Sequence, residues 1–360
     1  MAATTTDRDE FVRLTDPYRR ELLAHCYRML GSVDEAEDLV QETYLRAWRS
    51  YDGYESRASL RTWLHRIATN TCLTALESRA RRPLPSGLGA PSQAPEEALR
   101  APVTDVPWLQ PLPDSLLDPA TVVTARGSLR LALVAALQHL PARQRAVLIL
   151  RDVLAWRSPE VAALLGTSNA AVKSTLQRAR ARLDEVAPDE DLVVEPEGAA
   201  DRDVLDRYMA AFEHADMDAL LGLLQDGVEL EMPPHLEWFR GKKDVLLFLR
   251  SRGHGQDRYR MLPTRANGQP ALVMYVRGAD GVLRAHSVQV LTVVGGTVAR
   301  ITAFIDLDQV GRFGFPRVMS CGALPGDAVA GAVSHRGSAA GRTPGRSGSA
   351  PEPTGQGGLR

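Results

Sequence analysis

The sequence predicts a multidomain protein with two all-α domains, a helical bundle and a helix-turn-helix, followed by an α+β cone domain. Apolar residues recur at helical spacing in two blocks on either side of a proline-rich segment, whereas they alternate at strand spacing only in the second half. The end of the chain is rich in glycine and cannot bury enough apolar surface to fold. The expected divisions are 14–82, 83–125, 126–186 and 201–318, with a disordered tail over 320–360.

The composition of the 360 residues, 44% hydrophobic and 24% charged, excludes a fully disordered chain. The longest strongly apolar stretch, Leu131–Leu137, is shorter than the roughly 18 residues of a membrane span, and the N-terminus has no signal-peptide pattern. The three cysteines are far apart and lack CxxC spacing, so we expect neither disulfides nor a metal site, and no other cofactor. These features favour a cytoplasmic protein without a membrane partner.

The net charge of −1 hides an asymmetry along the chain. Thr43–Arg82 has a balance of +5 and Arg126–Arg182 of +8, whereas Asp184–Asp308 has a balance of −9. Two basic blocks before an acidic one indicate a front half that binds a polyanion, although solvated basic helices give the same pattern.

Prolines mark the connection between the helical blocks. Pro83–Pro119 contains nine of them, which excludes a long helix and predicts an extended linker. Val106–Leu117 adds a tryptophan and several leucines, so we expect this part of the linker to dock on a neighbouring surface. A second break is expected at Ala187–Ala200, which is acidic and contains two prolines.

The first helical block has clear boundaries. A helix is expected over Tyr18–Leu30, ending at Gly31, and Ser32 with Glu35 then fits the capping box of a second helix. A polar loop and a basic helix over Leu60–Ala80 follow. Aromatic residues among arginines suit melted nucleic acid, because bases stack on rings while arginines meet phosphates. For Trp63 alone, packing in the core is an equal alternative.

The second helical block has the pattern of a helix-turn-helix. A helix over Ser128–His139 is followed by one that Pro141 opens, and then by a short helix that Ser158 caps and Gly166 closes. The last helix, capped by Ser168, presents polar and basic residues at its start, as DNA-reading helices do. Gln and Arg suit base edges, and Lys and Ser suit phosphates, whereas a plain helical hairpin is the alternative. The residues expected to face outward are Asn169, Lys173, Ser174, Gln177, Arg178 and Arg182, with Ala170 among those facing inward.

Two stretches carry a family resemblance. Residues 34–70 have the sequence DEAEDLVQETYLRAWRSYDGYESRASLRTWLHRIATN, and residues 140–183 have the sequence LPARQRAVLILRDVLAWRSPEVAALLGTSNAAVKSTLQRARARL. The first resembles region 2, and the second region 4, of the RNA polymerase sigma-70 family in its extracytoplasmic-function (ECF) branch. Both occur in the family's order over roughly Leu14–Glu185, about half of the chain.

The resemblance implies a dissociable polymerase subunit, not an enzyme, that directs promoter recognition, DNA melting and transcription initiation. The implied partners are promoter DNA and core RNA polymerase, through the clamp helices of its largest subunit and through the flap. The linker with Trp108 would thread toward the active-site cleft and the RNA exit path. The implied contacts with the clamp helices are Asp38, Gln41, Glu42, Arg46 and Trp48.

Promoter contacts are implied in the same way. The loop over 52–59 and the helix after it would capture and melt the minus-ten element, and the last helix would contact the minus-thirty-five element. A helix-turn-helix repressor outside the sigma family is the alternative, and it would block transcription where a sigma factor starts it. The implied DNA-binding residues are Arg57, Ser59, Arg61, Trp63, Arg66 and Asn70 in region 2, and Asn169, Lys173, Ser174, Gln177 and Arg178 in region 4.

The back half predicts helices followed by a meandering sheet, which is an α+β cone. A helix is expected over Asp203–Leu224, a strand over Val228–Met232 and a helix over Gly241–Arg250. Residues 207–234, RYMAAFEHADMDALLGLLQDGVELEMPP, resemble the SnoaL-like branch of the nuclear-transport-factor-like superfamily. The strands expected after them are Arg258–Arg265, Ala271–Arg277, Leu283–Val294 and Val298–Asp306.

The superfamily includes small isomerases and cyclases, so a cone pocket could hold a ligand or an acid–base pair. Its candidate lining residues are Trp238, Phe239, Tyr275, His286 and Asp306, although a satisfied core histidine is the alternative for His286. The cone could therefore be a small-molecule sensor or a residual isomerase-like enzyme.

Minimal members of the branch stop after region 4, and many are held by a separate anti-sigma protein. The acidic C-terminal domain is expected to fold back on the basic sigma regions and control them in cis, either by restraining them or by holding them in an active pose, so that no separate anti-sigma factor is required. Phe313–Met319 is the candidate docking strip, with packing onto the cone itself as the alternative.

Overall fold

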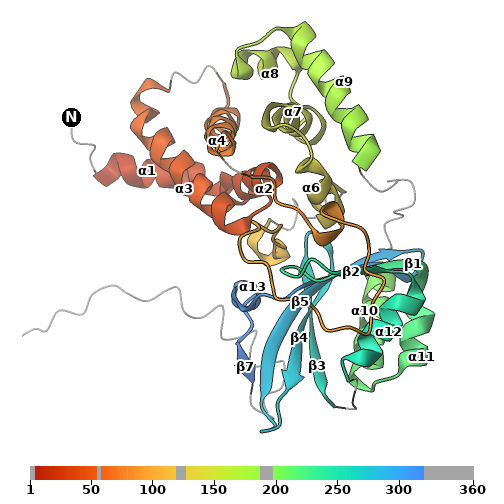
Figure 1. Ribbon diagram of the computed structural model, residues 1–360. Coiled ribbons are helices and arrows are strands. Elements are labelled where there is room, and N and C mark those ends of the chain that lie inside the picture. Colours follow the sequence, from red (N-terminus) through yellow and green to blue (C-terminus); the bar gives the residue numbers. More distant parts are fainter. Residues whose placement is uncertain are drawn as a thin grey trace, which may run out of the picture. The chain divides into compact units, whose positions relative to one another are not determined.

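The predicted fold class, two helical domains followed by an α+β domain, is confirmed by the computed structural model (Figure 1). The structure describes residues 5–54, 58–78, 80–118, 127–186, 198–253, 255 and 257–319. Arg57, residues 187–197 of the break expected at Ala187–Ala200, and the expected tail over 320–360 lie outside these residues. The last three residues of that expected break are helical instead, because a helix begins at Gly198. No helix among the described residues is long and apolar enough to cross a membrane.

The boundary between the second and third helices of the N-terminal bundle agrees with prediction, whereas the helix at Thr5–Thr15 was not predicted. Gly31 ends the second helix with a φ of +71°, and the Ser32 hydroxyl accepts a hydrogen bond from the Glu35 N–H at 3.3 Å, which caps the third helix. The fourth helix ends at Leu76, four residues before the predicted end. The helices are α1 (Thr5–Thr15), α2 (Arg19–Leu30), α3 (Val33–Arg49) and α4 (Leu60–Leu76), with 3-10 turns at Asp16–Tyr18 and Tyr51–Gly53.

The second helical domain differs from prediction at its start. The single helix expected over Ser128–His139 is broken at Arg130, which has a ψ of 137°. The Leu131 N–H donates to Gln269 Oε1 at 2.9 Å instead of to a helical carbonyl. Arg157 is the N-cap of the short helix, and not Ser158. The elements are α6 (Leu131–Leu137), α7 (Ala142–Leu148), a π-helical segment (Ile149–Val153), α8 (Ser158–Leu165) and α9 (Asn169–Val186).

The C-terminal domain begins with two helices where one was expected. Ala215 has a φ of +55°, and Asp216 then caps the second helix by accepting from the Ala219 N–H at 2.8 Å. The helices are α10 (Gly198–Glu213), α11 (Met217–Leu223), α12 (Lys242–Ser251) and α13 (Leu307–Arg312). The strands are β1 (Leu224–Glu231), β2 (Trp238–Arg240), β3 (Tyr259–Ala266), β4 (Gln269–Arg277), β5 (Leu283–Val294), β6 (Thr297–Phe304) and β7 (Val318–Met319).

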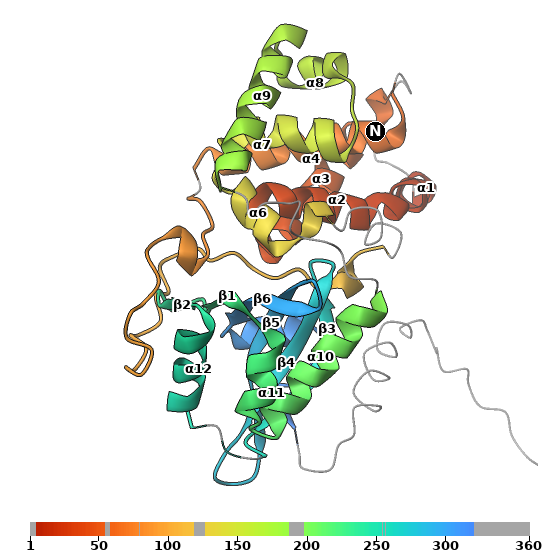
Figure 2. The same ribbon diagram turned by 90° about the vertical axis from the view of Figure 1, so that its right-hand side faces the viewer.

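The strands form one sheet in the order β2-β1-β6-β5-β4-β3, with β7 paired to β5. Its pairings are antiparallel except for β1 with β6, which is parallel. Helices α10, α11 and α12 cover one face, and α13 packs on the other (Figures 1 and 2). Tyr208, Phe239 and Phe248 belong to the core on the first face, whereas Val273, Val288 and Val290 face the second core.

The second face of the sheet shares its core with the helical domains and the linker. Leu109, Leu112 and Leu117 are buried there, which confirms that this part of the proline-rich linker docks. Trp108 donates its indole N–H to the Val103 carbonyl at 2.8 Å, so the ring folds back on the linker itself.

Candidate nucleic-acid interface and C-terminal cavity

The residues implied to contact the polymerase lie along α3. Asp38, Gln41 and Arg46 are exposed, and Glu42 pairs with Arg46 at 2.7 Å one turn later. Trp48 is half-buried, because its ring meets that of Phe11 edge-on with centroids 5.2 Å apart. The first four side chains therefore remain accessible, whereas Trp48 also holds α1 against α3.

The region 2 residues implied to contact DNA surround the start of α4. Ser59 caps the helix by accepting from the Thr62 N–H at 3.1 Å, which fixes its hydroxyl. Arg61 donates its Nε–H to both carboxylate oxygens of Glu21 at 2.9 Å, and this pairing raises the pKa of Arg61. Arg66 and Asn70 are exposed on the same helix. The charge of Arg61 is therefore balanced by Glu21, whereas the side chains of Arg66 and Asn70 are open to solvent.

Aromatic residues hold the loop before α4. Trp63 lies with its ring centroid 4.9 Å from that of Tyr54 and 6.4 Å from that of Tyr51, which in turn meets Phe11 at 5.1 Å. The Tyr54 hydroxyl donates to the Ala58 carbonyl at 2.6 Å. Trp63 is half-buried in this cluster, so packing explains its position as well as base stacking does. Phe11, which the sequence analysis missed, completes the cluster.

The helix-turn-helix has the geometry that the sequence predicts. Gly166 closes α8 with a φ of +61°, and the Ser168 hydroxyl accepts from the Ala171 N–H at 3.1 Å at the start of α9. Along α9 the buried residues are Val172, Leu176 and Ala179, whereas Ala170, expected to face inward, is exposed. The predicted outward residues are all exposed: Asn169, Lys173, Ser174, Gln177, Arg178 and Arg182.

Helix α9 is fixed by contacts away from its exposed face. Arg180 forms an ion pair with Asp152 of the π-helical segment at 2.7 Å. Arg143 of α7 donates to the Leu165 carbonyl at 2.6 Å, where α8 ends. The first contact holds α9 and the second holds the end of α8, while Lys173, Gln177 and Arg178 of α9 remain accessible.

The two helical domains pack against each other, with α7 in contact with α4 and α2. Arg145 of α7 is buried and donates to the Met29 carbonyl at the end of α2 and to Gln138 Oε1 at 2.8 Å. Burial lowers the pKa of Arg145 to about 10, which leaves it charged at neutral pH. A buried guanidinium whose N–H groups meet carbonyls of both domains makes this contact specific.

Asn267, at the tip of the β3–β4 hairpin, joins the C-terminal domain to both helical domains. Asn267 and Gly268 have φ values of +57° and +70°, as an Asn-Gly hairpin turn requires. The Asn267 side chain is fully buried. Its amide N–H groups donate to the Tyr27 hydroxyl at 2.8 Å and the Leu129 carbonyl at 2.7 Å, and its oxygen accepts from the Leu112 N–H at 2.8 Å.

Neighbouring polar groups extend this joint. Gln110 Oε1 accepts from the Ser32 hydroxyl at 2.9 Å and the Val33 N–H at 2.8 Å, so the linker supplies part of the cap of α3. Asp114 of the linker pairs with Arg265 at 3.2 Å and accepts from the Gly268 N–H at 2.8 Å. The Asn-Gly pair predicts a turn, but nothing local in the sequence indicates these distant partners.

The expected docking strip after the last long strand packs on its own domain. Val318 and Met319 pair with β5, and the Tyr275 hydroxyl donates to the Pro316 carbonyl at 2.8 Å. The contact with the first bundle is made instead by α13, which precedes this strip in the chain, and there Arg312 pairs with Asp34. Burial alone would raise the pKa of Asp34, but hydrogen bonds from Arg312 and Gln110 outweigh it and lower the pKa.

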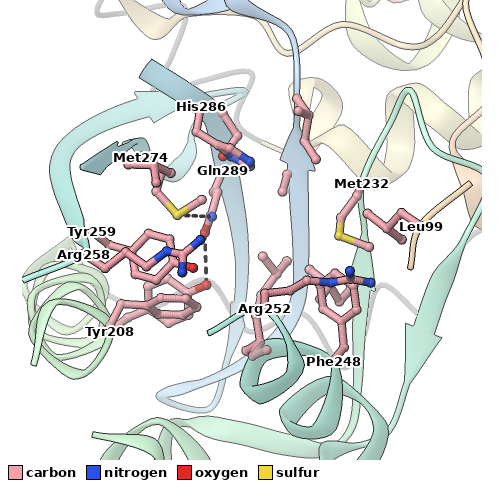
Figure 3. Close-up of a pocket in the computed structure, with 18 residues that line it drawn as sticks. Leu99, Tyr208, Met232, Phe248, Arg252, Arg258, Tyr259, Met274, His286 and Gln289 are labelled. Atoms are coloured by element: carbon pink, nitrogen blue, oxygen red, sulfur yellow. Dashed lines mark hydrogen bonds between the residues drawn. The ribbon is translucent and has the colours of Figure 1, made fainter. Parts of the chain in front are cut away.

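The C-terminal domain contains a partly open cavity of about 290 Å³ between the sheet and α10 and α12 (Figure 3). Of the predicted lining residues only His286 lines it. The Trp238 indole instead donates to the Gly89 carbonyl at 2.9 Å, the Tyr275 hydroxyl bonds Pro316, and Phe239 stacks on Phe248 at 4.6 Å. Asp306 caps α13 by accepting from the Asp308 N–H at 2.9 Å, so the expected acid–base pair with His286 does not form.

The charge state of His286 follows from its surroundings. Burial lowers the pKa of His286, and neighbouring His235 and Arg258 lower it further, so the imidazole is neutral at neutral pH. Among the described residues, no group of three or more His, Cys, Asp or Glu side chains could hold a metal ion.

Comparisons with known proteins agree with this organisation. Residues 14–82 match the family model of sigma-70 region 2, and residues 130–183 match that of sigma-70 region 4. ECF RNA polymerase sigma factor SigG of Mycobacterium tuberculosis is 50% identical over 315 residues, which cover 86% of this chain and 85% of the relative. The crystal structure of Mycobacterium tuberculosis SigJ, also an extracytoplasmic function sigma factor, matches with a TM-score of 0.56 and 26% identity over 86% of this chain and 99% of that one. The chain therefore belongs to the extracytoplasmic-function branch of the RNA polymerase sigma-70 family.

Proposed function

We propose that this sigma factor is controlled in cis, with the C-terminal domain holding its two helical domains in a docked arrangement that must open at a promoter. As a member of the family, the chain binds core RNA polymerase and recognises promoter DNA. The observation that carries the further step is the buried Asn267 amide, which binds the first bundle, the linker and the second bundle at once.

The geometry of promoters supports the proposal that the docked arrangement restrains promoter binding. The minus-ten and minus-thirty-five elements are centred roughly 25 base pairs apart, which is about 85 Å along B-DNA. Helix α9 is only about 27 Å long, and the helical domains are in direct contact through α7 and α4. Two domains in contact cannot reach both elements, so they must separate, and separation breaks the contacts of Asn267.

We further propose roles for the exposed side chains. Asp38, Gln41, Glu42 and Arg46 form the polymerase face, because they are accessible to solvent on one long helix with an acidic start. Arg66 and Asn70 contact the minus-ten element. Trp63 and Ser59 position the loop that precedes them. Arg61 contacts the DNA once the DNA phosphates replace Glu21 as its partner. Asn169, Lys173, Ser174, Gln177 and Arg178 contact the minus-thirty-five element from the exposed face of α9.

The test is promoter-specific transcription with Asn267→Gly in the full-length chain. Glycine keeps the positive φ but removes the amide, which should cost the docked state about 1–3 kcal/mol and shift docking by a factor of roughly 5 to 150. We expect more transcripts at limiting sigma factor and unchanged binding to core polymerase. Asp257→Gly is the matched control, because Asp257 also has a positive φ (+61°) but lies exposed in a turn.

A restraint of this kind replaces a separate anti-sigma factor. The purified full-length chain should therefore be less active than Asn267→Gly with core polymerase alone. Equal activity of the two chains, with both folded by circular dichroism, would contradict control in cis and leave the restraint to another protein.

A ligand sensor is the second candidate, because the C-terminal domain contains a cavity that a linker residue, Leu99, helps to line. The enzyme alternative has less support, since Asp306 caps α13 and does not line the cavity with His286.

A further inference from the structure

The cavity in the C-terminal domain has the size and walls of a small-molecule site. Its volume of about 290 Å³ is close to the lower end of the roughly 300–1,000 Å³ that is typical of ligand pockets. Phe212 of α10, Phe248 of α12 and Met232 just after β1 form apolar walls, with Leu230 and Ile301 on the sheet. A pocket with mostly apolar walls and a few polar groups is the usual form of a ligand site.

The polar groups of the cavity include hydrogen-bonding atoms that the described protein leaves unused. Within the described residues, neither the Ser287 hydroxyl nor His286 Nδ1 has a hydrogen-bond partner, and Ser287 is fully buried. Gln289 accepts from the Tyr208 hydroxyl at 3.0 Å, but its amide N–H reaches only the thioether of Met274 at 3.4 Å (Figure 3). Buried polar atoms without partners are costly, and a polar ligand group would satisfy them.

The charges that line the cavity are positive. Arg258 lies beside Tyr259, and Arg252 lies over Phe248 with its guanidinium carbon 4.7 Å from the ring centroid (Figure 3). No aspartate or glutamate is among the described residues that line the cavity. This charge distribution favours an anionic group on a ligand with an apolar body.

The linker forms part of the cavity wall. Leu99 lines the cavity, and the segment around it is held on the C-terminal domain at several points. The Ser92 N–H donates to the Trp238 carbonyl at 2.7 Å, the Val103 N–H to the Pro234 carbonyl at 2.8 Å, and Arg100 pairs with Glu237 at 2.7 Å. A ligand in the cavity would contact Leu99 only while the linker is docked.

We propose that this cavity binds a compact apolar carboxylate whose body packs under Leu99, so that the bound ligand tightens the linker on the C-terminal domain. The carboxylate meets Arg258 and the unpaired Ser287 hydroxyl, and the apolar part meets the aromatic walls. Because the ligand contacts Leu99 only when the linker is docked, it binds the docked state more tightly and shifts the chain toward that state. Only the consequence for transcription rests on the proposed function.

The binding test uses 3-phenylpropionate as the probe and 3-phenylpropan-1-ol as its neutral analogue, titrated calorimetrically into the full-length chain. We expect the carboxylate to bind about tenfold more tightly than the alcohol, a difference of about 1.4 kcal/mol. Arg258→Gln should remove that preference, and Arg284→Gln, an exposed arginine paired with Asp280, should keep it. Equal binding of acid and alcohol to the native chain, or no binding of either, would overturn the proposal.

A cavity-filling variant locates the binding. Ala303→Leu places a larger side chain in the cavity and should weaken 3-phenylpropionate binding about tenfold or more. Ala299→Leu is the matched control on the same strand β6, because Ala299 does not line the cavity. Binding that survives Ala303→Leu in a chain that melts like the native one lies elsewhere and refutes the site.

The linker test uses hydrogen exchange of the same chain without polymerase. With 3-phenylpropionate bound, the amides of Ser92, Arg100 and Val103 should exchange more slowly. Leu99→Ala should abolish this slowing, whereas Leu88→Ala, at an exposed leucine of the same linker, should not. Unchanged exchange on ligand binding would refute the coupling. The proposed function is tested separately, because Asn267→Gly is assayed for transcription without any ligand.

Discussion

The Asn267 amide exchanges hydrogen bonds with the Tyr27 hydroxyl, the Leu129 carbonyl and the Leu112 N–H, and it is removed from solvent. A buried polar group left without its partner costs about 1–3 kcal/mol, so each of these groups depends on the others remaining in place. Aspartate would keep the positive φ, but its carboxylate would face the Leu129 carbonyl where an N–H now donates. The side chain therefore acts as a joint that is strong only when every segment is docked.

At the same scale, the proposed DNA reading rests on single side chains of α9. In holoenzyme, Arg178→Ala should cost about 1–3 kcal/mol at a cognate minus-thirty-five element and relax base preference, because arginine suits a guanine edge. Lys173→Ala should weaken cognate and scrambled DNA alike, as expected for a phosphate contact. Fluorescence anisotropy with both duplexes measures this. An equal loss on both duplexes for Arg178→Ala would rule out base reading by that residue.

Two buried histidines predict how stability depends on pH. Burial lowers the pKa of His25 well below 6.5, with His65 and Arg28 lowering it further, and burial lowers the pKa of His65 against the opposing charge of Glu21. At a pH below the histidine pKa of the unfolded chain, the unfolded chain binds protons that the folded chain does not bind. These histidines therefore do not reduce the free energy of unfolding above that pKa, and they reduce it increasingly as the pH falls below it.

Urea unfolding between about pH 7.5 and about pH 5.5 should show this loss, and His25→Gln should reduce its slope. Gln retains a group able to hydrogen-bond Thr69, which His25 contacts at 3.0 Å. The same slope in the variant would assign the pH dependence to other groups.

At the scale of elements, local signals predicted what local interactions decide. The boundary between α2 and α3 follows from Gly31 and Ser32 alone, and both its φ and its cap agree with prediction. The break at Arg130 was not predictable, because it depends on Gln269, which is 138 residues away and takes the Leu131 N–H. Strand alternation likewise placed His286 at the cavity, but it could not show that Asp306 lies beyond the end of β6 and caps α13.

The polymerase face of α3 is tested as an element. Asp38→Lys with Glu42→Lys reverses the charge of two side chains one turn apart and removes the Glu42–Arg46 pair. Both side chains point away from the bundle core, so helix content should stay unchanged while binding to core polymerase is lost. Co-purification with core polymerase measures binding. The control is the double variant Glu10→Lys with Glu77→Lys, which changes two exposed residues outside this face. If the Asp38→Lys, Glu42→Lys variant still binds core polymerase, the interface lies elsewhere.

At the scale of the whole molecule, the sheet has a different partner on each face. One face is covered by α10, α11 and α12, and the other shares a core with the linker and both helical domains (Figure 2). The family was predictable from the motifs of regions 2 and 4. The shared core was not predictable, because the sequence around Leu109, Leu112 and Leu117 does not indicate which surface these leucines pack against.

Deleting all residues after Glu185 should raise promoter-specific transcription and leave binding to core polymerase intact, because the restraint is removed and the α3 face is kept. Deleting only residues 322–360 should change neither. Transcription in vitro from a cognate promoter, with equal amounts of folded sigma factor, measures both effects. Unaltered activity of the longer deletion would count against control by the C-terminal domain.

The position of Asn267 late in the chain also sets an order in time. Synthesis completes α9 at Val186 and reaches Asn267 about 80 residues later, an interval of roughly 4–16 s at bacterial rates of translation. During that interval both helical domains exist without the amide that joins them. Under the proposed control in cis, a newly made chain can meet polymerase before it closes, whereas an older chain must first open. The proposal therefore implies that the readiness of this sigma factor to start transcription depends on its age as well as on its surroundings.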